Sequence, residues 1–134
     1  MGIVGAAGGV GQAYILNSKL VLELDLKALC DLPEEKIHQQ AERRKVTLDE
    51  VAKKNGVGFW TTNYEEMLSR GDVDVVCVGV PDYLHTDYAL KALKAGKHVF
   101  LTKPIGTTLA EVKKLVKTVD ETGMKFLASY GHGP

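Results

Sequence analysis

The sequence has no excess of charge of either sign and no long apolar run. Its 17 Lys and Arg residues are balanced by 17 Asp and Glu residues, so the formal net charge is zero. A protein that binds nucleic-acid phosphates needs a basic excess, and we therefore expect no nucleic-acid partner. No apolar run approaches the ~18 residues of a membrane span, and no basic stretch followed by an apolar one marks a signal peptide. We expect a cytoplasmic protein without membrane contact.

Cysteine is also scarce, and the two that occur, Cys30 and Cys77, lie far apart within apolar runs. They form no CxxC pair and no His lies at ligand spacing from them, so we expect reduced core thiols and no metal site. Hydrophobic residues make up 45% of the 134 positions and charged residues 25%, which is typical of a globular rather than a disordered chain. We therefore expect one domain over residues 1–134, with a core that needs no disulfide.

Apolar runs and helical patterns alternate six times along the chain. The expected strands are residues 2–5, 26–31, 57–61, 74–80, 98–101 and 125–130. The expected helices are residues 10–20, 33 to about 45, 47–55, 64–70, 82–95 and 108–122. Right-handed crossovers then predict an α/β fold, a doubly wound parallel six-stranded sheet with the order 3-2-1-4-5-6. This arrangement is one dinucleotide-binding (Rossmann) unit.

Glycine is the one residue in excess, and four of the 14 glycines crowd into residues 5–11, between the first strand and the first helix. Glycine allows a sharp turn there and lets a pyrophosphate approach the main chain, while the helix N-terminus supplies N–H groups. The expected cofactor contacts in this loop are Gly5, Ala7, Gly8, Gly9, Val10 and Gly11. The alternative is a structural turn in a doubly wound protein that binds a flavin, a coenzyme A ester or S-adenosylmethionine.

An acidic residue, Asp31, ends the second strand, 20 residues after Gly11. At this spacing a carboxylate reaches the adenosine ribose, where it accepts from the hydroxyl groups and repels a 2′-phosphate. The sequence therefore favours NAD over NADP as the cofactor. The alternative for Asp31 is a solvated strand end or a helix cap. We interpret Arg43 and Arg44, farther along the expected helix, as part of a solvated face.

The fourth and fifth strands of such a sheet end at the crevice where ligands bind. Topology alone therefore places Pro81, His85 and Lys103 near the nicotinamide end of a dinucleotide. The alternatives are that His85 packs locally at a helix start and that Lys103 is a surface lysine.

The segment 74–104 resembles the N-terminal domain of the Gfo/Idh/MocA (glucose–fructose oxidoreductase and inositol dehydrogenase) family. The matching motifs are Pro81-x-x-x-His85, the run AGKHV at 95–99 and Lys103-Pro104. The flanking segments also fit, so the resemblance covers essentially the whole chain.

This resemblance implies an NAD(P)-dependent oxidoreductase that transfers hydride between the cofactor and a sugar, a polyol or a related carbinol. In the family, the lysine of the Lys-Pro motif contacts the substrate hydroxyl and the nicotinamide, which makes Lys103 the catalytic residue here. A cation beside the carbinol oxygen stabilises the developing alkoxide as hydride leaves. The cofactor contacts expected at this end are Val80, Pro81, His85, Lys103 and Pro104.

Three features depart from the family pattern. Thr102 stands where the family usually has Glu, which removes a partner for the lysine. The glycine loop is spaced more like that of malate dehydrogenases. The family's second domain, which binds the small-molecule substrate, does not follow the sixth strand. We therefore expect little turnover from this chain alone, and self-association through the face that such a domain would cover.

Two other functions remain open. A non-enzymatic NAD-sensing module would need the glycine loop and Asp31 but not Lys103. A malate-dehydrogenase-like enzyme is supported by the glycine loop alone. It is disfavoured because the sequence shows no arginine-rich loop and no catalytic His–Asp pair.

Overall fold

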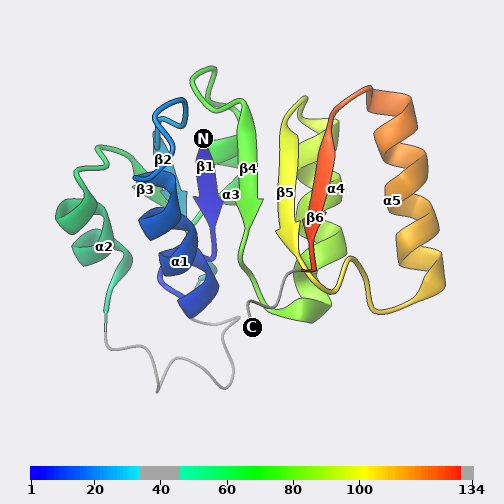
Figure 1. Cartoon of the computed structure of the whole chain (residues 1–134), viewed down its shortest axis with the longest axis horizontal. Coiled ribbons are helices and arrows are strands. Elements are labelled where there is room, and N and C mark those ends of the chain that lie inside the picture. Colours follow the sequence, from blue (N-terminus) through cyan, green and yellow to red (C-terminus); the bar gives the residue numbers. More distant parts are fainter. Residues whose placement is uncertain (34–45, 131–134) are drawn as a thin grey trace.

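A computed structural model describes residues 1–33 and 46–130. In these residues a six-stranded sheet has the order β3-β2-β1-β4-β5-β6, and every neighbouring pair is parallel. Figure 1 shows the sheet with helices on both of its faces. The strands are β1 (Gly2–Val4), β2 (Ala28–Cys30), β3 (Trp60–Thr61), β4 (Val75–Val78), β5 (His98–Thr102) and β6 (Phe126–Ser129). The predicted doubly wound α/β fold and its strand order are confirmed.

The helices also follow the predicted order. They are α1 (Gly9–Ser18), α2 (Leu48–Asn55), α3 (Tyr64–Leu68), α4 (His85–Lys94) and α5 (Leu109–Thr122). The helix predicted from residue 82 begins instead as a 3-10 turn, η3 (Asp82–Leu84), and only then becomes α4. All but the first residue of the helix predicted over residues 33–45, including Arg43 and Arg44, lies outside the described residues. None of the helices in the described segments is long and apolar enough to cross a membrane.

Local capping sequences set the ends of two helices where they were expected. Thr47 and Glu50 form a reciprocal capping box at the start of α2, and Thr108 and Glu111 form another at the start of α5. Each box satisfies main-chain N–H groups that the first helical turn leaves without a partner. Gly56 ends α2 and Gly123 ends α5, both in the left-handed conformation, with φ of 67° and 68°.

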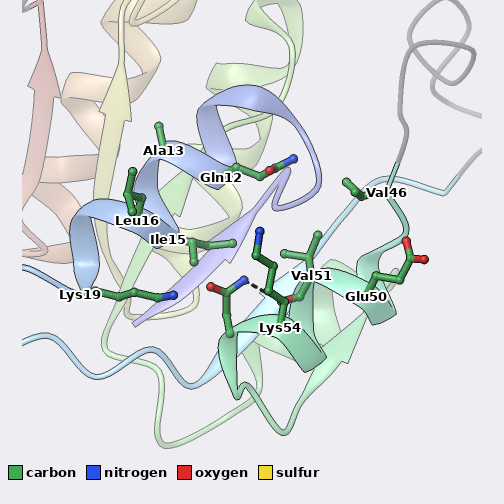
Figure 2. Close-up of a pocket in the computed structure, with 10 residues that line it drawn as sticks. Gln12, Ala13, Ile15, Leu16, Lys19, Val46, Glu50, Val51 and Lys54 are labelled. Atoms are coloured by element: carbon green, nitrogen blue, oxygen red, sulfur yellow. Dashed lines mark hydrogen bonds between the residues drawn. The ribbon is translucent and has the colours of Figure 1, made fainter.

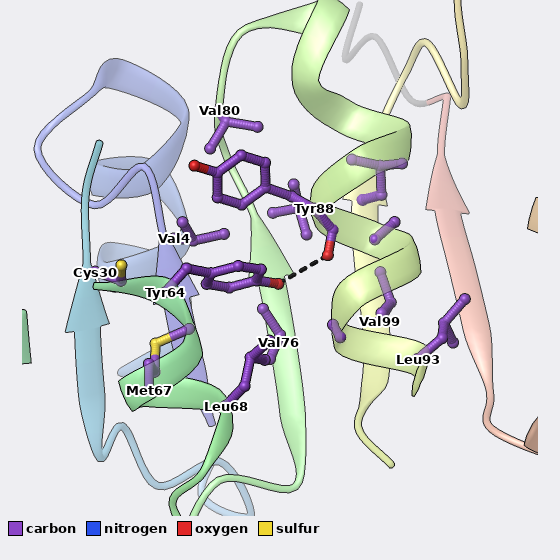
Figure 3. Packing of buried hydrophobic residues seen from close by; sticks show 14 of the residues in the cluster. Val4, Cys30, Tyr64, Met67, Leu68, Val76, Val80, Tyr88, Leu93 and Val99 are labelled. Atoms are coloured by element: carbon purple, nitrogen blue, oxygen red, sulfur yellow. Dashed lines mark hydrogen bonds between the residues drawn. The ribbon is translucent and has the colours of Figure 1, made fainter. Parts of the chain in front are cut away.

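Apolar side chains pack on both faces of the sheet. One cluster joins the sheet to α3, α4 and α5, and Figure 3 shows its tyrosine pair, in which the Tyr64 hydroxyl donates to the Tyr88 carbonyl oxygen at 2.9 Å. The other cluster joins the sheet to α1 and α2. On that second face no described helix covers β6 (Figure 1), and Leu127 of β6 is 62% exposed. Burial on both sides explains why β4 is a continuous apolar run.

Candidate functional site

The glycine loop follows β1 and meets the end of β4 at the carboxyl edge of the sheet. Gly5 has a φ of 79°, and a Cβ atom there would lie 2.5 Å from the carbonyl carbon and oxygen of Gly79. A Cβ atom on Gly11 would overlap the carbonyl oxygen of Gly5. Both glycines are therefore required by the main chain itself, one for the turn and the other for the close approach of α1 to the loop.

The N-terminus of α1 has the features of an anion site. Gly8 is its N-cap residue, no side chain caps the helix, and no acidic residue lies in its first turn. A Cβ atom on Gly9 would meet no atom within 4 Å, and Val10 is 42% exposed. The first N–H groups of a helix lack intrahelical acceptors and carry the positive end of its dipole. Phosphate oxygens fit such an end because no side chain caps it and its first turn carries no acidic residue.

Asp31 follows β2 and connects the glycine loop to the neighbouring strand. The residue is 4% exposed, and its carboxylate accepts hydrogen bonds from the main-chain N–H groups of Ala7 and Leu32, each at 2.7 Å. The N–H of Ala6 donates to the Cys30 carbonyl at 3.0 Å, so two successive loop residues are held against the end of β2. The sequence spacing placed Asp31 beside the loop, but no sequence signal showed that its carboxylate also holds the loop.

The loops after β4 and β5 form the other half of the crevice edge, and His85 lies between them. The His85 side chain is buried. Its Nε2 is 2.9 Å from the carbonyl oxygen of Val80, and its Nδ1 is 2.7 Å from the carbonyl oxygen of Pro104. Topology predicted that His85, Pro81 and Lys103 would be brought to the same edge, and the structure does so. However, His85 faces protein carbonyls and is not presented on the crevice surface.

Lys103 comes directly after β5, and its side chain is exposed. Its main-chain N–H donates to the Ser129 carbonyl at 3.0 Å, while its ammonium has no hydrogen bond or ion pair within the described residues. The peptide bond from Lys103 to Pro104 is cis. The exposed ammonium is therefore available to a ligand in the crevice.

A residue that the sequence reasoning missed, Tyr14 of α1, lies behind Thr102. Its hydroxyl is 3.4 Å from the Val78 carbonyl, and its ring packs edge-on against Phe100 with centroids 5.5 Å apart. Burial raises the pKa of the Tyr14 phenol, and hydrogen bonding with Thr102 partly opposes that rise. Thr102 therefore interacts with α1.

A pocket with a volume of about 650 Å³ lies elsewhere, between α1 and α2 (Figure 2). Ile15 and Lys19 line it from α1, and Val51 and Lys54 line it from α2. It lies on the flanks of two helices, whereas ligands of doubly wound sheets bind outside the carboxyl ends of the strands. No group of His, Cys, Asp and Glu within residues 1–33 and 46–130 could hold a metal ion. The strand ends are therefore the candidate site.

Comparison with known proteins agrees with this geometry. The family model described as "Oxidoreductase family, NAD-binding Rossmann fold" (GFO_IDH_MocA) matches residues 1–130. The chain belongs to the Gfo/Idh/MocA family. It therefore has the NAD-binding Rossmann fold of a family of NAD(P)-dependent oxidoreductases.

Several Gfo/Idh/MocA relatives are similar over part of their length. A glycosyl hydrolase family 109 protein of Solibacter usitatus is 32% identical over 126 residues, which are 91% of this chain and 28% of that protein. A 1,5-anhydro-D-fructose reductase of Ensifer adhaerens is 38% identical over 73 residues, which are 54% of this chain and 22% of that enzyme. The chain thus spans less than a third of the length of these relatives.

Solved structures of other proteins superpose on nearly all of the chain. Scyllo-inositol dehydrogenase of Lactobacillus casei, with NAD(H) and scyllo-inositol bound, has a TM-score of 0.78 at 27% identity and covers 96% of this chain and 35% of its own. Biliverdin reductase of Synechocystis, with biliverdin and NADP⁺ bound, has a TM-score of 0.78 at 25% identity, covering 96% and 37%. Both dinucleotides occur on this fold, so the family alone does not decide between NAD and NADP.

Proposed function

We propose that this chain is the nucleotide domain of a dehydrogenase or reductase of sugars, polyols or related carbinols, and that it binds NAD(H) in preference to NADP(H). The observation that carries the cofactor preference is the 2.7 Å hydrogen bond from the Ala7 N–H to the Asp31 carboxylate. It holds an acidic side chain beside the loop that would take the pyrophosphate. A 2′-phosphate on the adenosine ribose would meet this carboxylate and be repelled, whereas two ribose hydroxyls could donate to it.

The residues of the loop bind the dinucleotide mainly through main-chain groups. The N–H groups at the start of α1, around Gly9 and Val10, donate to the pyrophosphate, and the open space at Gly9 lets it approach. Gly5 and Gly11 keep the loop in the required conformation. Val80, Pro81 and Pro104 border the nicotinamide end, where hydride transfer takes place when the cofactor is bound.

Lys103 has the catalytic role in this proposal. Its exposed ammonium stands at the end of β5 and stabilises negative charge on the carbinol oxygen as hydride leaves. Because the chain spans about a third of its relatives, we propose that residues 1–134 supply the cofactor site and that another domain supplies the substrate contacts. Lys103→Ala should abolish turnover of an assembled enzyme. An NAD-sensing module would respond to NADH equally with either residue.

The cofactor preference is tested by calorimetric titration with NADH and NADPH. We expect NADH to bind at least tenfold tighter, which is about 1.4 kcal/mol of discrimination. Asp31→Asn removes the negative charge and should bring the two affinities together, whereas Glu121→Gln, the same loss of charge on α5, should leave the ratio unchanged. Equal affinities in the unaltered chain would refute the role of Asp31, and absence of heat with both nucleotides would refute the cofactor site.

A further inference from the structure

His85 connects two loops that are far apart in the sequence. It is the first residue of α4, and its side chain is 3% exposed. The ring contacts the carbonyl of Val80, which follows β4, and the carbonyl of Pro104, which follows β5 (2.9 and 2.7 Å). These are the two loops that border the nicotinamide end of the proposed site.

Both ring nitrogens face main-chain carbonyls. A carbonyl oxygen accepts hydrogen bonds and cannot donate them, so whichever ring nitrogen carries the N–H donates to one of these carbonyls. The charged group beside the ring is Asp82, whose Oδ1 lies 3.9 Å from Nε2. With both nitrogens directed at protein carbonyls, the ring has no donor left for a ligand. Its role is therefore to hold the protein.

The loop after β5 is held on both sides of Lys103. Before Pro104, the Lys103 N–H donates to the Ser129 carbonyl at 3.0 Å, which ties it to β6. After Lys103, His85 holds the Pro104 carbonyl, and the adjacent Thr86 hydroxyl lies 3.4 Å from the Ile105 carbonyl. The first turn of α4 thus anchors the main chain at two successive residues directly beyond the lysine.

We propose that His85 is a positioning residue that fixes the Lys103–Pro104 loop against the end of β4, and thereby sets where the Lys103 side chain and the nicotinamide meet. This inference rests on the proposed function, since the loop matters to a dinucleotide only if the crevice binds one. It replaces the expectation that His85 lines the cofactor pocket.

The anchoring is tested first without nucleotide, by amide hydrogen exchange. His85→Leu removes both ring nitrogens, and we expect the Lys103 amide, which donates to the Ser129 carbonyl, to exchange at least tenfold faster. His85→Gln keeps an N–H donor and should restore part of the protection; it also serves if the Leu variant does not fold. Leu93→Ala, a fully buried position on the same helix, is the matched control and should not act selectively on this loop. Unchanged exchange in both His85 variants would overturn the anchoring.

The functional consequence is tested with NADH and ADP-ribose, which share the adenosine and pyrophosphate but differ in the nicotinamide. We expect His85→Leu to weaken NADH about tenfold and ADP-ribose less than twofold, with His85→Gln between Leu and the unaltered chain. The positioning role would be refuted if His85→Leu weakened the binding of both nucleotides equally, as a general loss of structure would. It would also be refuted if the variant bound both nucleotides as tightly as the unaltered chain. If the unaltered chain bound neither nucleotide, the proposed function would fall and the nicotinamide role with it. The exchange result would still decide whether His85 holds the loop.

Discussion

Gly5 provides the sharpest test of the glycine loop, because both its conformation and its surroundings exclude a side chain. Its φ of 79° costs a residue with a Cβ roughly 1–2 kcal/mol. An added Cβ would lie 2.5 Å from the carbonyl group of Gly79 and 2.8 Å from the Val80 nitrogen, all of them main-chain atoms. Forcing extra atoms into packed structure typically costs about 1–3 kcal/mol. Gly5→Ala should therefore lower the free energy of unfolding by about 2–5 kcal/mol.

Gly9→Ala is the matched control within the same loop. A Cβ there would meet no atom within 4 Å, and Gly9 is the first residue of α1. Alanine favours a helix over glycine by up to about 1 kcal/mol, so stability should be unchanged or slightly higher. NADH affinity should nevertheless fall, since the new methyl group occupies the space through which the pyrophosphate approaches. The two variants thus separate the contribution of the turn at Gly5 to stability from the contribution of the start of α1 to phosphate binding.

Urea denaturation followed by far-UV circular dichroism measures both variants on one scale. The free energies come from linear extrapolation, with equal slopes required for a valid comparison. Gly5→Ala within about 0.5 kcal/mol of the unaltered chain, the range of ordinary surface substitutions, would refute the argument from main-chain contact. A Gly9→Ala chain as destabilised as Gly5→Ala would refute it as well.

Further predictions concern the core and the uncovered sheet face. Tyr64→Phe deletes the buried hydrogen bond to the Tyr88 carbonyl and should cost about 1 kcal/mol in urea denaturation; no change would show that the bond contributes nothing. Burial raises the pKa of the Cys30 and Cys77 thiols from 9.0 to about 12, so the folded state holds these protons more tightly and both thiols should react with a thiol reagent at pH 8 only on unfolding. That stability is present below pH 9 and should be lost as the pH rises towards 12. Leu127→Lys, on the face of β6 that no described helix covers, should reduce self-association in sedimentation; an unchanged distribution would exclude this face as the contact.

Much of the fold followed from local patterns. The alternation of strands and helices determines the sheet order once crossovers are right-handed, and the capping boxes at Thr47 and Thr108 placed two helix starts correctly. Most strand lengths were overestimated, most clearly for residues 57–61, of which only Trp60–Thr61 form β3. A strand extends only as far as its neighbour offers partners, and β2 opposite it has three residues. Apolar composition does not contain that information.

The candidate site, too, was predicted only in part from the sequence. The sequence by itself determined that glycines 5–11, Asp31 and Lys103 would meet at one edge of the sheet, because parallel strands present their carboxyl ends together. Only the tertiary structure decided what their groups do there. Asp31 holds the Ala7 N–H across 24 residues, and His85 holds the Pro104 carbonyl across 19. Such contacts depend on the paths of the loops between strands and on which buried polar groups still need a hydrogen-bond partner. Neither can be predicted from a periodic pattern or a fixed spacing in the sequence.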